Sequence, residues 1–445
     1  MPSLPPQLLN SLNSFDHFNE VAFVAVHSDE HKITSLRLNP FKKVDLDLAL
    51  GEPVPWNSLG YYLDTRPSFT LDPLFHAGCY YVQEAGSMFL EFALKQYVNF
   101  EEDLRILDIS AAPGGKSTLI NSLMSAGSLL VANEIVKTRA EILAQNLSKW
   151  GTCNTMVTNS EPSRFSELSS FFDVLVLDAP CSGSGLFRKQ PEAIDQWSES
   201  NVEVCSIRQR KIIEDVLPSL KEGGILFYST CSYSHQENED IVRCLVEEHC
   251  MEYLSLPIDA DWGIVETPYG YRFYPHLTKS EGFFCALLRK QADKTHAIRT
   301  RKKTGLEVTG NEKAILRPFI PLHAEFTIKI NERYHAMSVA AAEFIYSFAK
   351  QFYFKKAGIA IGEIKGNDVV PNHELAMALE ISPEINYVEL DKENALKFLR
   401  KETFSVGENQ KGFSLMRYKH QGLGWAKILP NRVNNYLPNE LRILK

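Results

Sequence analysis

The sequence lacks any apolar run long enough to cross a membrane, since none of its hydrophobic stretches approaches about eighteen residues. Its first residues, MPSLPPQLLNSL, contain no basic segment followed by an apolar core, so we expect no signal peptide. Internal repeats and low-complexity segments are missing as well. These absences argue against a membrane-spanning protein and favour a globular protein of the cytoplasm.

Cysteine pairs and clusters are also missing. The eight cysteines form no CxxC motif and no tight spacing with histidine, so we expect neither a disulfide framework nor a metal site. Reduced thiols fit this pattern better. Three of them, Cys205, Cys244 and Cys250, are expected to be small buried side chains without a chemical role.

The chain as a whole has no excess of positive charge, since its net charge is −8. The charge is unevenly distributed, however. Residues 291–445 contain 24 lysines and arginines against 17 acidic residues, whereas residues 1–290 contain 23 against 38. A basic C-terminal part on an acidic body is typical of a protein that contacts a polyanion at one end, although an ordinary solvated surface would give the same excess.

With 445 residues, the chain is long enough for two or three domains. A polar, basic stretch that is poor in large apolar residues divides it. We predict an N-terminal α+β region at 1–100, an α/β domain at 101–290, a basic linker at 291–313 and a β-rich C-terminal region at 314–445. We expect a monomer.

Apolar runs and amphipathic stretches alternate between residues 104 and 250. The predicted strands are LRILDIS, GSLLVANEI, TCNTMVTNSE, FDVLVLDAP and ILFYSTCS. The predicted helices are STLINSLMSAG, VKTRAEILAQNLSKWG, ended by Gly151, and VEVCSIRQRKIIEDVLPSLKEGG, ended by its two glycines. Such alternation predicts a mostly parallel sheet with helices on both faces and a ligand site beyond the carboxyl ends of the strands. At such ends lie residues 108–116, Glu134, Glu161, residues 178–184 and Cys231.

The loop SAAPGGKST has two interpretations. A phosphate-binding P-loop requires G-x-x-x-x-G-K-[ST], but Ser110 stands where the first glycine belongs, and the residues after it make a poor phosphate cradle. A nucleoside cofactor without a polyphosphate fits better, because the turn brings backbone N–H groups to the ligand. Glu134 would then accept hydrogen bonds from the ribose hydroxyls and Glu161 would meet the adenine edge, a pattern that suits S-adenosylmethionine.

Three motifs, LDISAAPGGKST, DAPCSGSGLFRK and STCSYSHQENE, occur in this order and together resemble those of the RNA 5-methylcytosine methyltransferases of the Nol/Nop/Sun (Fmu) family. Residues 60–94 are similar to the stretch that precedes the methyltransferase core in that family. The closing GLGWAKILPNRVNNYLPNELRIL resembles the PUA-like RNA-binding tail of its RsmF-type 16S rRNA enzymes. The resemblance implies a Rossmann-like, S-adenosylmethionine-dependent methyltransferase core, a PUA-like C-terminal domain and 16S rRNA or the 30S subunit as substrate.

The resemblance also implies roles for individual residues. Glu134 would bind the ribose, Glu161 would approach the adenine, and Asp178 would line both the cofactor and the target base. The cofactor loop would consist of Ser110, Ala111, Ala112, Pro113, Gly114, Gly115 and Lys116. The chain departs from the family at two of these positions, because the family often has cysteine at Ser110 and commonly aspartate at Glu161.

The chemistry requires a nucleophile because C5 of cytosine is too poor in electrons to attack a methyl sulfonium. A thiolate that adds to C6 loads electron density onto C5, a proton donor at N3 balances the developing charge, and a base removes the C5 proton afterwards. The resemblance assigns attack to Cys231 and product release to Cys181. We expect burial to raise the pKa of Asp178 so that it can donate a proton to N3. In a competing arrangement, familiar from DNA cytosine methyltransferases, Cys181 attacks instead.

The acidic body requires local basic and aromatic elements to hold RNA. We expect Arg188 and Lys189 to contact phosphates, Gln83 and Glu84 to narrow the substrate cleft, and His235 to lie at the surface. Further candidates for RNA contacts are Arg299, Arg301, Lys302, Lys303, Arg417, Lys419, Trp425, Lys427 and Arg432. Two other functions stay open: a tRNA cytosine-C5 methyltransferase, and a non-catalytic RNA-binding or ribosome-assembly protein on the same fold.

Overall fold

The computed structural model describes residues 4–15, 17–29, 32–291, 308–404, 406 and 411–444. The four linker candidates, Arg299, Arg301, Lys302 and Lys303, lie outside these residues. Within the described ranges, no helix is long and apolar enough to span a membrane.

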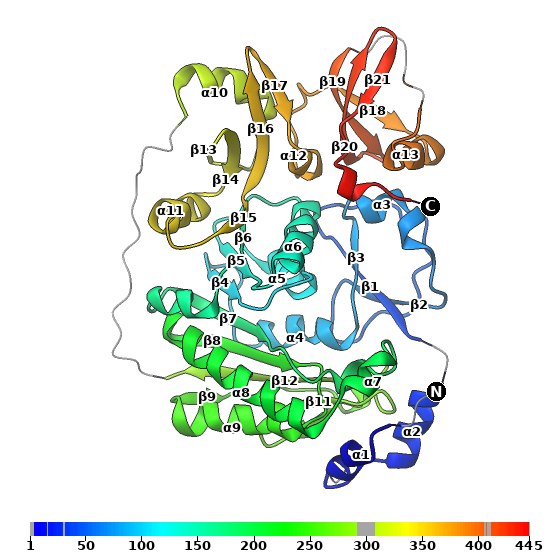
Figure 1. Cartoon of the computed structure of the whole chain (residues 1–445), viewed down its shortest axis with the longest axis vertical. Coiled ribbons are helices and arrows are strands. Elements are labelled where there is room, and N and C mark those ends of the chain that lie inside the picture. Colours follow the sequence, from blue (N-terminus) through cyan, green and yellow to red (C-terminus); the bar gives the residue numbers. More distant parts are fainter. Residues whose placement is uncertain are drawn as a thin grey trace.

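One mostly parallel sheet forms the centre of the molecule (Figure 1). In spatial order its strands are β10 (Val265–Thr267), β11 (Gly270–Phe273), β12 (Phe283–Lys290), β8 (Leu220–Thr230), β7 (Phe172–Asp178), β4 (Arg105–Asp108), β5 (Leu129–Asn133), β6 (Thr155–Thr158) and β15 (Phe354–Ala357), and β9 (Met251–Tyr253) pairs with β12. Strands β4 to β8 are parallel, whereas β12 and β15 are antiparallel to their neighbours β8 and β6. The five predicted strands and their parallel arrangement are confirmed.

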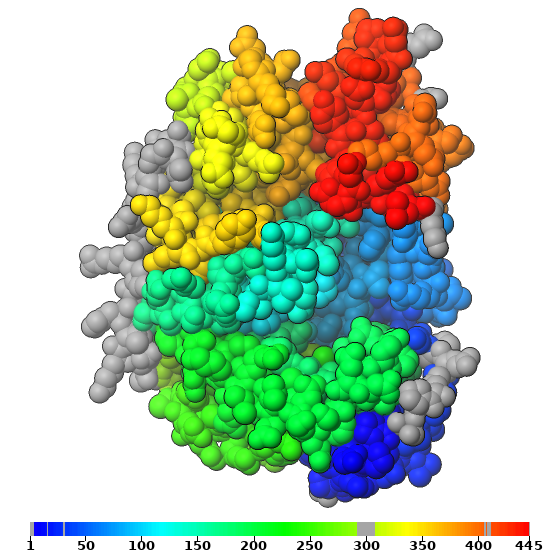
Figure 2. All heavy atoms as spheres, viewed as in Figure 1, coloured from blue at the N-terminus to red at the C-terminus, as the bar shows by residue number. Residues whose placement is uncertain are grey.

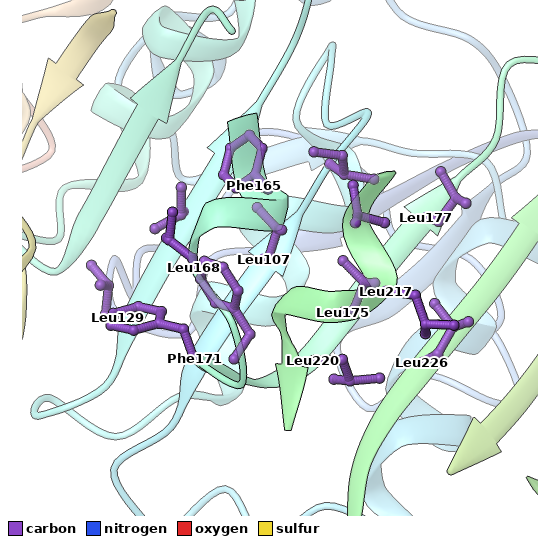
Figure 3. Packing of buried hydrophobic residues seen from close by; sticks show 14 of the residues in the cluster. Leu107, Leu129, Phe165, Leu168, Phe171, Leu175, Leu177, Leu217, Leu220 and Leu226 are labelled. Carbon is purple, nitrogen blue, oxygen red and sulfur yellow. The ribbon is translucent and has the colours of Figure 1, made fainter. Parts of the chain in front are cut away.

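Helices cover both faces of this sheet. One face packs against α8 (Glu199–Val216) and α9 (Glu239–Glu248), and the other against α4 (Phe89–Lys95), α5 (Gly115–Leu123) and α6 (Lys137–Trp150). Successive residues of one strand point to opposite faces: Leu107 lies in the first core and Ile106 in the second. Figure 3 shows the first core, where leucines of β4, β5, β7 and β8 meet Phe165, Leu168 and Phe171.

Glycines set two helix ends, the first of them at the cavity described below. Gly114 has a φ of +113° directly before α5, and Gly151 has a φ of +92° directly after α6, as expected for a left-handed C-cap. The predicted end of α8 at two glycines is wrong. The helix stops at Val216 because Pro218 follows, and Gly223 and Gly224 lie inside β8.

The N-terminal region is small and mixed, as predicted. It comprises α1 (Pro6–Leu12), α2 (Glu20–Ser28), α3 (Pro73–His76) and an antiparallel sheet of β2 (Gly60–Leu63), β1 (Thr34–Leu38) and β3 (Tyr80–Val82). Arg37 of β1 is fully buried and donates hydrogen bonds to Gln83 at 2.9 Å and to Thr118 of α5 at 2.7 Å. This contact fixes the segment after β3 against the start of α5.

Two further four-stranded sheets follow the core in the chain. The first contains β13 (Phe326–Ile330), β14 (Arg333–Met337), β16 (Ile359–Lys365) and β17 (Asp368–Pro371). The second contains β18 (Tyr387–Leu390), β19 (Gly412–Tyr418), β20 (Gln421–Leu429) and β21 (Arg432–Asn435). Their helices are α10 (Gly310–Leu316), α11 (Val339–Phe348), α12 (His373–Met377) and α13 (Lys392–Leu399). The β-rich C-terminal prediction is confirmed.

These C-terminal parts pack directly against the rest of the chain (Figure 2). Strand β15 completes one edge of the central sheet. One apolar core joins Leu36 and Leu74 of the N-terminal region to Phe398 and Met416 of the C-terminal sheet. The predicted boundaries therefore divide a chain whose parts share sheets and cores.

Candidate functional site

A cavity of about 580 Å³ opens at the carboxyl ends of β4, β7 and β8. Segments from three parts of the chain meet there. It is lined by Tyr81, Val82, Gln83, Glu84, Ser87, Asp108, Ser110, Ala111, Ala112, Pro113, Gly115, Lys116, Arg139, Asp178, Leu186, Lys189, Gln190, Cys231, Glu281, Gly282 and Phe283. The structure thus brings most of the predicted glycine loop together with Asp178 and Cys231, and Gln83 and Glu84 also line the cavity.

Asp108 ends β4 and is completely buried. Its Oδ2 accepts a hydrogen bond from Ser117 at 2.6 Å, whereas its Oδ1 has no hydrogen-bond partner among the described residues. Burial raises the pKa of this carboxyl to about 7. A buried acid with one free oxygen at the cavity wall is suited to a cationic group of a ligand.

The two predicted acids of the next strands do not line the cavity as expected. Glu134 is buried, and its Oε1 accepts a hydrogen bond from the Val136 N–H at 2.9 Å. Its Oε2 lies 3.5 Å from Arg139, which does line the cavity and donates a hydrogen bond to the Ala112 carbonyl at 2.9 Å. Glu161 is exposed beyond β6. Glu134 is thus connected to the cavity wall through its ion pair with Arg139.

Asp178 ends β7 and faces Lys116. Its Oδ2 lies 2.9 Å from the Lys116 Nζ, and its Oδ1 accepts a hydrogen bond from Ser229 at 2.8 Å. Its side chain is 37% exposed, so the expectation of a buried carboxyl is wrong, because the end of β7 opens into the cavity. Burial lowers the pKa of Lys116, but the attraction of Asp178 outweighs burial and leaves this pKa above its ordinary value.

The two motif cysteines lie side by side. The Sγ atoms of Cys181 and Cys231 are 3.1 Å apart, and both thiols are free. The hydrogen bond to Cys231, together with burial, raises the pKa of Cys181 well above its ordinary value. Cys181 is thus held as a protonated thiol against the sulfur of Cys231. The Lys116 ammonium also interacts electrostatically with Cys231.

A single buried carboxylate holds the loops of both cysteines. Glu237 accepts hydrogen bonds from the Ser182 N–H at 2.7 Å, the Ser182 Oγ at 2.6 Å and the Ser232 Oγ at 2.5 Å. Ser182 follows Cys181 and Ser232 follows Cys231 in the chain. Our sequence analysis missed Glu237 as a positioning residue, although it stands in the quoted motif STCSYSHQENE.

Of the two predicted phosphate contacts near the cavity, one lines it and the other is buried. Lys189 lines it, but Arg188 is buried with its Nη1 3.6 Å from Glu281, so the expectation of a surface phosphate contact is wrong for Arg188. His235 is half-exposed, with its Nδ1 3.1 Å from Asp240. Cys250 is exposed rather than buried, because a left-handed turn places it at the end of the α9 segment.

The candidates of the C-terminal sheet are largely occupied within the chain. Trp425 is in the core and donates a hydrogen bond to the Asn372 carbonyl at 2.8 Å, so it offers no stacking face for RNA. Arg417 pairs with Glu389 at 3.1 Å, and Lys419 pairs with Asp47 at 2.6 Å. Lys427 covers the ring of Phe413, whereas Arg432 is exposed.

One group of potential metal ligands escaped the sequence analysis. Cys244, Glu248 and His249 offer donor atoms within 4.8 Å of one another on and after α9. The spacing C-x₃-E-H departs from the common zinc motifs, and the group does not line the cavity.

Comparison with protein families matches three parts of the chain. The model described as 16S rRNA methyltransferase RsmB/F matches residues 95–289. The N-terminal domain of 16S rRNA methyltransferase RsmF matches residues 4–85, and the methyltransferase RsmF PUA domain matches residues 385–443.

Whole proteins are similar over most of their length. The ribosomal RNA small subunit methyltransferase F of Shewanella woodyi is 32% identical over 436 residues, which cover 92% of this chain and 89% of the relative. That of Aliivibrio fischeri strain MJ11 is 31% identical over 419 residues, with 88% and 85% covered.

Solved structures share the fold. A methyltransferase homolog from Pyrococcus horikoshii aligns with a TM-score of 0.52 at 27% identity, covering 64% of this chain and 100% of the other. NSun6 from the same organism, solved with SFG, aligns with a TM-score of 0.54 at 21% identity, covering 65% and 99%.

Proposed function

Since the chain belongs to the 16S rRNA methyltransferase RsmB/F family, we propose that it transfers a methyl group from S-adenosylmethionine to C5 of one cytosine in 16S rRNA. The observation that carries this proposal is the pair of free thiols 3.1 Å apart, in one site with the Asp178–Lys116 ion pair. A methyltransferase that acts on an oxygen or an exocyclic nitrogen has no need of a thiol, because those atoms already carry lone pairs.

The residues of the cavity fit S-adenosylmethionine. The free Oδ1 of Asp108 is suited to the ammonium of its methionine part, and the loop from Ser110 to Gly115 offers backbone groups beside it. When bound, S-adenosylmethionine supplies an electrophilic methyl group.

We assign the steps on cytosine to three side chains. The Cys231 thiolate forms a bond to C6, and Asp178, after taking up a proton, donates it to N3, so that electron density moves to C5. After methylation, a base removes the C5 proton, N3 returns its proton to Asp178, the C5–C6 double bond re-forms, and the bond from C6 to the Cys231 sulfur breaks as that sulfur takes up a proton. The Cys181 thiol lies against that sulfur and is placed to return a proton to it.

The geometry of the site favours Cys231 over Cys181 as the nucleophile. Of the two thiols, Cys231 lines the cavity and interacts electrostatically with Lys116, whereas the hydrogen bond and burial keep the proton on Cys181. The curated relatives at about 31% identity act, by their names, on small-subunit rRNA rather than on tRNA.

Bisulfite sequencing tests the reaction and its substrate. Ribosomal and transfer RNA are compared between a strain that lacks the gene and the same strain complemented with the wild-type or the C231S form. We expect one cytosine of 16S rRNA to be protected only with the wild-type form. Protection of a tRNA cytosine instead would contradict the assignment of 16S rRNA as the substrate. The absence of any difference between the strains would contradict methylation at C5.

Cofactor affinity should depend on the ionisation of Asp108. Because its pKa is about 7 and only the carboxylate attracts an ammonium, we expect affinity to rise from pH 5.5 to 7.5, by up to about tenfold per pH unit below 7. The α-amino group of the cofactor stays mostly protonated over this range. The D108N variant should bind about 10- to 100-fold more weakly at pH 7.5 and lose the pH dependence.

Isothermal titration calorimetry with S-adenosylmethionine measures this effect. S117A is the matched control, because it removes the hydrogen bond to Oδ2 but keeps the carboxyl group. Without that hydrogen bond the pKa of Asp108 should rise further and the binding curve should move to higher pH. An unchanged pH dependence in D108N would exclude Asp108 as the ammonium partner.

A further inference from the structure

Glu281 is a second buried carboxylate at the cavity wall, directly before β12. Its side chain is only 2% exposed, and neither of its carboxylate oxygens has a hydrogen-bond partner among the described residues. The nearest cation is Arg188, whose Nη1 lies 3.6 Å from Oε1, farther than a hydrogen bond reaches. The reaction steps assigned above do not use Glu281.

A neighbouring pair shows what a satisfied buried glutamate looks like in this protein. Arg272 donates hydrogen bonds of 2.6 and 2.5 Å to both oxygens of Glu239, and both side chains are buried. Glu281 has the same burial without those donors. Because an unpaired buried carboxylate is costly, its place at a cavity wall is explained by a ligand that brings donors.

The backbone holds Glu281 next to the attacking cysteine. The Glu281 N–H donates a hydrogen bond to Glu84 at 2.9 Å. The next residue, Gly282, donates to the carbonyl of Gly185 at 3.1 Å, and Gly185 donates to the carbonyl of Cys231 at 2.9 Å. A Cβ on Gly282 would lie 2.5 Å from the Cα of Gly185, so only glycine permits this approach. The loops of Cys181, Cys231 and Glu281 therefore form one connected wall.

We propose that Glu281 accepts a hydrogen bond from the 4-amino group of the target cytosine and so selects cytosine over uracil. This inference rests on the proposed function. The 4-amino group is the donor on the pairing edge of cytosine, and it adjoins N3, the atom assigned to Asp178. Uracil has a carbonyl oxygen at that position, which would face the carboxylate and leave it unpaired.

Asp108 and Glu281, the two buried carboxylates of the cavity, are assigned to different ligand groups. Asp108 is assigned the cofactor's ammonium, and the glycine loop with Arg139 forms the cofactor side of the cavity. Glu281 is linked instead to the loop of Cys231 through the backbone hydrogen bonds of Gly282 and Gly185, and the reacting base must lie beside Cys231. Burial raises the pKa of Glu281 and the Arg188 guanidinium opposes that rise, so donors from a bound base would further favour the carboxylate.

A cycle of protein and substrate changes tests this contact. The substrates are two short RNAs spanning the mapped cytosine, one with cytidine at the target position and one with the pyrimidin-2-one ribonucleoside, which lacks only the 4-amino group. Equilibrium binding is measured in full-length C231S protein, so that no chemistry occurs, with and without E281A. We expect E281A to weaken binding of the cytidine RNA by about 10- to 100-fold and to leave the pyrimidin-2-one RNA unchanged within about threefold.

Two further variants keep the test decisive. E281Q keeps the shape and one acceptor oxygen, so it should lose part of the preference for cytidine even if E281A fails to fold. E52Q removes an exposed carboxylate, 78% accessible and paired with Lys279, and should leave the binding of both RNAs unchanged. Equal losses on both RNAs, or no loss on either, would overturn the role of Glu281. Failure of C231S to abolish methylation would instead contradict the proposed function, and the binding cycle would still report on Glu281.

Discussion

Replacing Cys181 with alanine is expected to leave the enzyme covalently attached to its RNA, and replacing Cys231 with alanine is expected to abolish methylation. Cys231 forms the bond to C6, so its loss should lower the rate by about 10⁴-fold or more. In C181A the attack still occurs, but the thiol that lies 3.1 Å from Cys231 can no longer donate a proton to the departing sulfur. Denaturing gel electrophoresis of the variants with labelled RNA and S-adenosylmethionine separates the two outcomes.

The matched control for both variants is C79A. Cys79 is also a free, buried thiol, but it lies in the core shared by the N-terminal and C-terminal regions. This variant should lose some stability while it turns over normally and forms no lasting adduct. Loss of turnover in C181A together with full activity in C231A would reverse the assignment and support attack by the Pro-Cys thiol.

The placement of the site could be predicted because it depends on local patterns. Alternating apolar runs and amphipathic stretches predict a parallel sheet, and a parallel sheet brings its strand ends to one edge. Asp108, Asp178 and Cys231 each follow such a run, so their meeting in one cavity required no knowledge of packing.

The orientation of side chains could not be predicted in the same way. Glu281 reaches the cavity from the loop before β12, which runs antiparallel to β8, and nothing within its own segment indicates which loop it will contact. Arg188 follows the Pro-Cys motif like a surface cation, yet it is buried against Glu281. Trp425 alternates with basic residues in the sequence, but its indole is buried in one core with Leu375 and Met377 of α12.

The contribution of Asp178 to the rate of methyl transfer can be measured by replacing it with asparagine. In D178N the side chain keeps its shape and its place beside Lys116 but can no longer give a proton to N3, so we expect methyl transfer to slow by about 10²- to 10⁴-fold. Cofactor affinity should change little, because the ammonium is assigned to Asp108. Single-turnover methyl transfer at saturating RNA and S-adenosylmethionine measures the chemical step directly.

The other end of the same strand supplies a matched control for D178N. Asp173 of β7 also pairs with a lysine, Lys221 at 2.6 Å, and accepts a hydrogen bond from the Arg105 N–H at 2.9 Å, but it does not line the cavity. D173N should lower the free energy of unfolding slightly and leave the rate of methyl transfer unchanged. If D178N transferred methyl groups at nearly the wild-type rate, protonation at N3 would need another donor. Lys116 would be a candidate, since its ammonium lies 2.9 Å from Asp178 Oδ2.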